Sequence, residues 1–155
     1  MSLSNITKDR NVVIGVDGTE VSLQALRHVA GIIGALGAKA IIVFVRHLPV
    51  VATEPGSEGA YAAVLESLDD LEREVKADIE AIFKDSSVSW SLVVREGDPA
   101  VEIVAVAHEH EAVAVAVGST IHGALSSILV SSVAEHLLHH CDITLIIVRP
   151  DKDAA

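Results

Sequence analysis

The chain has 155 residues, of which 50% are hydrophobic but only 3% aromatic, and its 22 Asp and Glu residues outnumber its 11 Lys and Arg residues, so the net charge is −11. This length fits one domain, which we expect to span residues 1–155 with an ordered core from about residue 10 to residue 150. The negative charge repels phosphate backbones and anionic lipid surfaces, so we expect neither nucleic acid nor membrane as a partner.

Five short apolar runs alternate with helical patterns along the chain. Each run is about as long as a strand and rich in β-branched residues. The predicted strands are residues 12–16, 40–45, about 88–94, 112–117 and 143–148. This alternation favours right-handed crossovers, and therefore a parallel sheet with helices on both faces. We predict a three-layer, doubly wound α/β fold with five parallel strands.

The first two predicted helices follow the first two strands. The residues that recur at helical spacing in the first of them are Leu26, Val29, Ala30, Ile33 and Leu36. The second is a longer apolar stripe from Tyr61 to Ile82, and the acidic residues between its members are expected on a solvated face. Residues 49–60, which precede this stripe, are rich in Pro, Gly and Ser and predict a mobile surface loop.

The third predicted helix begins at Asp98 and Pro99, because a capping residue followed by Pro in the first turn is a typical helix start. Its residues expected to face inward are Val101, Val104 and Ala107. The fourth helix is expected from about Ser131 to His140. Its residues expected on the buried face are Val133, Ala134 and Leu137.

Three segments leave the carboxyl ends of predicted strands, which is where open α/β sheets bind ligands. They are residues 17–19 after the first strand, residues 46–47 after the second, and the residues from Gly118 onward after the fourth. Taken alone, Asp17-Gly18-Thr19 is better explained as a turn followed by a helix cap. A ligand contact at this segment remains the alternative.

Four stretches of the chain resemble the universal stress protein family, in matching order and spacing. They are VVIGVDGTEVSLQAL, REGDPAVEIVAVAHEH, the VGS turn after the fourth strand, and SSVAEHLLHHCDITLIIVRP. The resemblance covers nearly the whole chain. It implies a five-stranded sheet in the order 3-2-1-4-5 and a homodimer formed through the last strand, Ile143 to Val148. In one branch of the family it also implies ATP binding.

The phosphate loop departs from the pattern of the ATP-binding members. That pattern is glycine, two residues, glycine, nine residues, then glycine and serine or threonine. Here the corresponding positions hold Gly118, Ile121, Ser131 and Ser132, while Gly123 lies two positions late. Isoleucine is β-branched and resists the positive φ that glycine tolerates, so Ile121 places phosphate binding in doubt.

The adenosine side of the site resembles the family pattern more closely. Asp17 matches the acidic residue at the end of the first strand, and Val45 matches the apolar residue beside the adenine. Phe44 stands where many members have His. The residues that we predict to bind the nucleotide are Asp17, Gly18, Thr19, Val45, Gly118, Ser119, Gly123, Ser131, Ser132 and Val133.

The predicted function is that of a stress-response regulator that binds ATP, with Mg, or a related adenine nucleotide. No Walker-type Lys or general base is evident in the sequence, so we expect no enzyme activity beyond slow ATP hydrolysis. The alternative is a nucleotide-free homodimeric interaction module whose phosphate loop is disabled by Ile121 and Ser131. A hydrolase that uses Asp17 or a histidine is a third hypothesis, and no triad or metal cluster in the sequence favours it.

Two features near the end of the chain concern metals and partners. His136 and His140 share a helix face at metal-ligand spacing, but the sequence places no acidic or Cys partner beside them, so we expect a surface or interface role and no metal. An exposed apolar edge such as ITLIIV invites aggregation, and two-fold pairing with a second copy removes that edge.

The expected location is the cytoplasm. The single cysteine, Cys141, allows no disulfide within the chain, and MSLSNITKDR does not resemble a signal peptide.

Overall fold

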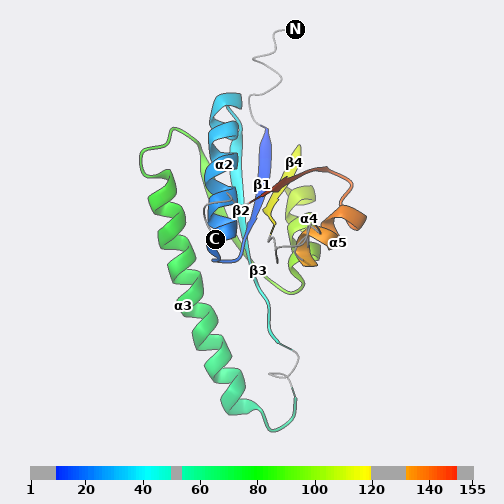
Figure 1. Ribbon diagram of the computed structural model, residues 1–155. Helices are drawn as coiled ribbons and strands as arrows, with labels where there is room; N and C mark the ends of the chain where they lie inside the picture. The colour runs from blue at the N-terminus through cyan, green and yellow to red at the C-terminus, as the bar shows by residue number, and fades with distance from the viewer. Residues whose placement is uncertain (1–9, 50–53, 120–131, 150–155) are drawn as a thin grey trace, which may run out of the picture.

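The computed structural model describes residues 10–49, 54–119 and 132–149, and it contains one five-stranded sheet (Figure 1). The elements are β1 (Asn11–Val16), α2 (Glu20–Leu36), β2 (Lys39–Arg46), α3 (Glu58–Phe83), β3 (Trp90–Glu96), α4 (Pro99–Glu109), β4 (Ala114–Gly118), α5 (Ser132–His140) and β5 (Thr144–Val148). The strands are parallel and lie in the order β3-β2-β1-β4-β5. This confirms the predicted fold class and strand order.

Two boundaries differ from the sequence-based predictions. Strand β3 begins at Trp90, two residues later than expected. Helix α3 begins at Glu58, so the end of the stretch predicted as a loop, 49–60, is already helical. The reason is local, because the Gly-Ala-Tyr-Ala-Ala-Val-Leu sequence that follows Glu58 is mostly apolar and rich in helix-forming Ala. Ser131, the expected start of the last helix, lies outside the described residues.

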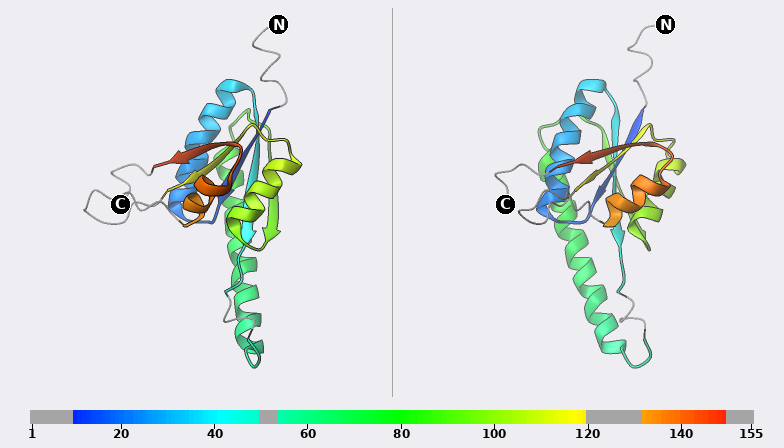
Figure 2. Two further views of the ribbon diagram at one scale, coloured as in Figure 1. Left: turned by 90° about the vertical axis from the view of Figure 1, so that its right-hand side faces the viewer. Right: turned by 45° about the vertical axis from the view of Figure 1, so that its right-hand side comes forward.

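Two hydrophobic cores, one on each face of the sheet, hold the layers together. The helices lie on both sides of the sheet (Figure 1, Figure 2). Helices α2 and α3 cover one face, where they pack against Val12 and Ile14 of β1. Helices α4 and α5 cover the other, where they pack against Val13. Side chains of a strand point alternately to opposite faces, so one apolar run supplies both cores. This explains why the strands are nearly continuous hydrophobic runs.

The inward face of α4 differs from the prediction. Val101, expected to face inward, is 55% exposed, whereas Ile103 is 3% exposed. Ala107 is buried, as expected, and Val104 is only half-buried. Residues two apart in a helix are about 200° apart around its axis, so burial of Ile103 turns Val101 toward solvent. The spacing predicted the helix correctly but not the side that faces the sheet.

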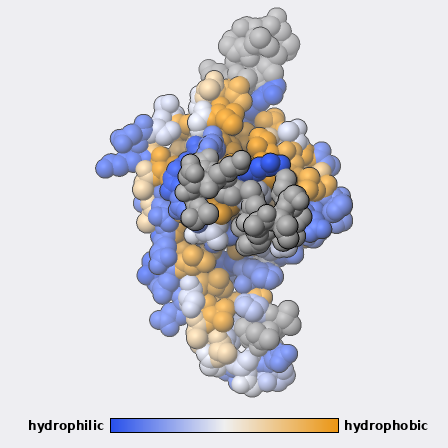
Figure 3. Space-filling view, viewed as in Figure 1, coloured by the Kyte–Doolittle hydropathy of each residue, from blue (hydrophilic) through white to orange (hydrophobic). Residues whose placement is uncertain are grey.

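Helix α3 is much longer than the strands beside it. Its 26 residues span about 39 Å, and its buried residues, Val75, Ile79 and Phe83, all lie in its second half. The first half projects past the carboxyl ends of the strands (Figure 1). Hydrophobic surface remains on this half, where Tyr61 is exposed and Val64 and Leu65 are half-buried (Figure 3). None of the helices in the described residues has the length and apolar character needed to cross a bilayer.

Candidate functional site

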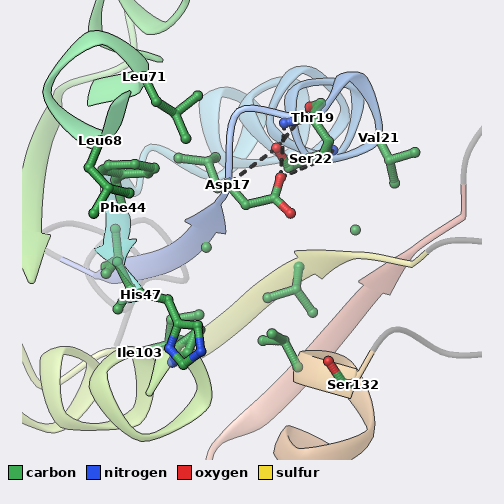
Figure 4. A pocket seen from close by; sticks show the side chains of 18 residues that line it. Asp17, Thr19, Val21, Ser22, Phe44, His47, Leu68, Leu71, Ile103 and Ser132 are labelled. Carbon is green, nitrogen blue, oxygen red and sulfur yellow. Dashed lines mark hydrogen bonds between the residues drawn. The ribbon is translucent and has the colours of Figure 1, made fainter. Parts of the chain in front are cut away.

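A cleft of about 360 Å³ lies at the carboxyl edge of the sheet. Its walls come from the ends of β1, β2 and β4, from the first residues of α2, α4 and α5, and from one side of α3 (Figure 4). The strand order reverses between β1 and β4, because β1 pairs with β2 on one side and with β4 on the other. The cleft therefore occupies the position at which open α/β sheets bind ligands.

Six of the predicted nucleotide-binding residues line this cleft. They are Asp17, Thr19, Val45, Gly118, Ser132 and Val133. Gly18 and Ser119 do not line it. Ser119 is buried, and its amide donates to the carbonyl of Val148 at 2.9 Å, which joins the ends of β4 and β5. Gly123 and Ser131, together with Ile121, lie outside the described residues.

Asp17 has a structural role at the start of α2. Its Oδ1 atom accepts from the Thr19 amide at 2.9 Å and from the Thr19 hydroxyl at 2.6 Å. The Thr19 hydroxyl in turn accepts from the Ser22 amide at 3.3 Å and so caps the helix. The interpretation of this segment as a turn and cap is therefore correct. These bonds use one carboxylate oxygen of an exposed side chain, which Figure 4 shows directed into the cleft.

The two glycines that flank the cleft are also required by packing. Gly18 has a φ of +84°, and a Cβ there would lie 2.8 Å from Leu71 Cδ1. A Cβ on Gly118 would lie 2.9 Å from the carbonyl oxygen of Val21, which is backbone and cannot move aside easily. Both positions therefore need glycine for the close approach of neighbouring elements, with or without a ligand.

One wall of the cleft is apolar. Phe44 is 2% exposed and lines the cleft beside Val45 at the end of β2, and Leu68 and Leu71 face them from α3 (Figure 4). The apolar stripe from Tyr61 to Ile82 predicted a core position for both leucines and gave no sign of a role in the cleft. The only sequence signal was their place on a helix that starts beyond the carboxyl edge. The phenyl ring of Phe44 has no hydrogen-bonding atom, so this wall favours a flat, apolar surface on a ligand.

An ion-pair cluster holds α3 against this wall. Arg46 Nη2 lies 2.8 Å from Asp69 Oδ1, Nη1 lies 3.0 Å from Glu72 Oε2, and Nε lies 3.9 Å from Glu96 Oε1. The hydrogen bond that Arg46 donates to Asp69 is the largest cause that raises the pKa of Arg46 above its ordinary value, and Glu72 adds to it. Two of the acidic residues expected on a solvated face, Asp69 and Glu72, therefore fix the helix to the end of β2.

The histidines of α5 do not form a metal site within the described residues. The rings of His136 and His140 are in edge contact with centroids 4.5 Å apart, and His136 Nδ1 lies 3.8 Å from Asp98 Oδ1. Across residues 10–49, 54–119 and 132–149, no three His, Cys, Asp or Glu side chains are grouped so that they could hold an ion.

Comparison with known proteins places the fold and the cleft in context. Residues 9–149 match the family model described as the universal stress protein family. The chain is 29% identical over 146 residues to universal stress protein MJ0531 of Methanocaldococcus jannaschii, an alignment that covers 93% of this chain and 85% of that protein.

Two solved structures have the same architecture. A universal stress protein family member from Burkholderia pseudomallei superposes with a TM-score of 0.72 at 20% identity, covering 89% of this chain and 94% of the other. A universal stress protein solved in complex with cAMP superposes with a TM-score of 0.57 at 26% identity, covering 90% and 96% of the two chains.

Proposed function

The chain belongs to the universal stress protein family, and we propose that it binds the adenosine part of an adenine nucleotide in the cleft at the carboxyl ends of β1, β2 and β4. The observation that carries this proposal is the convergence of six predicted binding residues on one cavity of about 360 Å³. That volume lies in the range of small-molecule sites. The family member solved with cAMP supports the choice of an adenine ligand.

Each part of the cleft has a proposed task. The free oxygen of Asp17 accepts hydrogen bonds from ribose hydroxyl groups. Phe44, Val45 and Leu71 pack against the base, because a flat aromatic ring gains most from an apolar wall. Ser132, the first residue of α5, lies at the cleft, where the positive end of the helix dipole favours a phosphate group.

We further propose that occupancy of the cleft, and not turnover, carries the stress-response function. Lys and Arg are missing from the described residues that line the cleft, so this part of the chain offers no cation of the kind that stabilises phosphoryl transfer. At most slow hydrolysis of ATP with Mg is expected, and the proposed location is the cytoplasm.

The proposed partner is a second copy of the chain, bound through β5. Strand β5 pairs with β4 on one side, and its apolar residues Leu145 to Val148 are only half-buried. Pairing with the same strand of a second copy would cover this edge. A dimer is also compatible with the alternative function, a nucleotide-free interaction module, for which Ile121 and Ser131 are the motivating residues.

The proposal is tested by titration calorimetry of protein freed of co-purified nucleotide, with AMP as the ligand and GMP as the base control. The matched variants are Asp17→Asn and Asp17→Ala. Asn keeps an oxygen for the two Thr19 hydrogen bonds but loses the charge, so the stability stays within about 0.5 kcal/mol while AMP binds at least about tenfold more weakly. Ala loses both functions.

Two results would contradict the proposal. If AMP, ADP and ATP all fail to bind at several millimolar, the nucleotide-free module becomes the better explanation. If Asp17→Asn binds AMP as tightly as the unmodified protein, Asp17 acts only as a turn and cap residue.

A further inference from the structure

The cleft is poor in positive charge. Among the described residues that line it, the ionisable side chains are Asp17 and His47, and neither Lys nor Arg is present. The amino-acid sequence from Val117 to Val148 contains no Lys or Arg. Arg149 follows β5 and is exposed, and it does not line the cleft. A polyphosphate would therefore enter a site without a cationic side chain on its walls.

The arginine nearest to the cleft in sequence is already engaged. Arg46 immediately precedes His47, which lines the cleft, but its guanidinium lies between three carboxylates, those of Asp69, Glu72 and Glu96. One positive charge there meets three negative charges, so the cluster presents a net negative charge beside the cleft. A phosphate that recruited Arg46 would have to displace carboxylates that hold α3 in place.

Two of the three helix ends at the cleft are occupied by groups of the chain itself. The first turn of α2 is capped by Thr19 and carries Glu20, and the first turn of α4 is capped by Asp98, whose Oδ1 accepts from the Val101 amide at 3.0 Å. Pro99, the first residue of α4, has no N–H to offer. The positive ends of α2 and α4 are therefore neutralised locally. Helix α5 begins at Ser132 in the cleft and carries Glu135 in its first turn, which partly offsets the positive end that remains for a phosphate group.

We propose that the cleft takes an adenine nucleoside or nucleoside monophosphate and discriminates against the triphosphate. This inference rests on the proposed adenosine site and names its ligand class. A helix end compensates at most about half a unit of charge, so each phosphate group added to the ligand increases the uncompensated charge. The further charges of a triphosphate would meet Asp17, Asp98 and the chain's net charge of −11, and the described residues that line the cleft supply no cationic side chain to balance them.

The experiment compares adenosine, AMP and ATP by calorimetry on the full chain, in buffer free of divalent cations, because bound Mg²⁺ would cancel two charges of ATP. Adenosine and AMP are expected to bind within about threefold of each other, and ATP at least about tenfold more weakly than AMP, which is about 1.4 kcal/mol. Raising the NaCl concentration from 0.1 to 1 M shortens the screening length from about 10 Å to about 3 Å. The affinity for ATP should therefore rise severalfold relative to that for adenosine, whereas a cationic phosphate site would lose ATP affinity.

A pair of charge variants tests the location of the effect. Asp98→Asn keeps an oxygen that can cap α4 but removes a negative charge beside Pro99 at the rim, so ATP affinity should rise about threefold or more while adenosine affinity is unchanged. Asp85→Asn changes the net charge equally but lies at the other end of α3, just after Phe83, and should alter neither affinity.

The outcomes separate this inference from the proposed function. If ATP binds as tightly as AMP or more tightly, and Asp17→Asn weakens that binding, the adenosine site stands and the charge-based inference is overturned. If equal effects arise from Asp98→Asn and Asp85→Asn, the discrimination does not come from the cleft and the inference also fails. If adenosine, AMP and ATP all fail to bind, both proposals are wrong.

Discussion

Replacing Gly18 by alanine is the sharpest test of how the turn after β1 is packed. Gly18 has a φ of +84°, and an added Cβ would lie 2.8 Å from Leu71 Cδ1 and 3.1 Å from Val75 Cγ2. Val75 lies on α3 and is fully buried in the core between this helix and the sheet. The substitution therefore imposes an unfavourable backbone conformation and also pushes on the helix that forms one wall of the cleft.

The two costs can be separated because the chain contains a matched glycine. Gly37, at the end of α2, has a φ of +64°, but no atom lies within 4 Å of a Cβ built there. Gly37→Ala therefore measures the backbone cost alone, about 1 kcal/mol. Gly18→Ala adds the displacement of packed side chains, about 1–3 kcal/mol, for a total of about 2–4 kcal/mol. At about 2–4 °C per kcal/mol, the melting temperature should fall by about 5–15 °C for Gly18→Ala and about 2–4 °C for Gly37→Ala.

Urea and thermal unfolding of both variants would be followed by circular dichroism and by the fluorescence of Trp90. This is the only tryptophan of the chain, and it stacks on Phe83 at the end of α3 with ring centroids 5.5 Å apart. It therefore reports directly on the helix that Gly18 contacts. Equal losses of stability in the two variants would refute the reasoning, because they would mean that Leu71 and Val75 offer no resistance to the added methyl group.

Three further substitutions test how the helices on either side of the cleft are held. Arg46→Met should destabilise the protein by about 1–2 kcal/mol in low salt. The loss should be smaller in 1 M NaCl, because the carboxylate partners of Arg46 are partly exposed and salt screens them. A loss of stability that does not depend on salt would contradict the ion-pair explanation. Because folding raises the pKa of Arg46, the charged side chain stabilises the folded protein at every pH below the pKa that Arg46 has in the unfolded chain. This stabilisation is lost only as the pH rises through the pKa of the folded state. The loss of stability in Arg46→Met should therefore be constant between pH 6 and pH 9 in urea titrations. Val101→Lys should change the free energy of unfolding by less than about 0.5 kcal/mol, because Val101 is exposed. Ile103→Ala should lower it by about 2–5 kcal/mol, because Ile103 is buried. A larger loss for Val101→Lys than for Ile103→Ala would mean that α4 is rotated on the sheet.

The candidate site was only partly predictable from the sequence. Asp17 and Thr19 were found because their segment follows the first strand, and parallel strands all end at one edge of the sheet. Val45 was found through its match to the family pattern. Leu68 and Leu71 were not found, because the same apolar spacing describes a residue that faces the core and one that faces a cleft.

What the sequence determined by itself was local. The alternation of apolar runs with helical stripes indicated the strands, the helices and a parallel sheet. The pair Asp98-Pro99 marked the start of α4, and Asp17-Gly18-Thr19 marked a turn and cap. The turn and the two helix caps depend on hydrogen bonds between residues at most three apart, so the chemistry of a short segment is enough to specify them.

Only the tertiary structure decided the contacts between distant segments. Helical spacing leaves the rotation of α4 on the sheet open, and packing of Ile103 against the core turned Val101 outward. Arg46 meets Glu72 across 26 positions in the sequence, because α3 returns along the end of β2. The need for glycine at residue 118 comes from the carbonyl of Val21, which lies on another element. Such contacts follow from the placement of whole elements, and no pattern within a single segment encodes that placement.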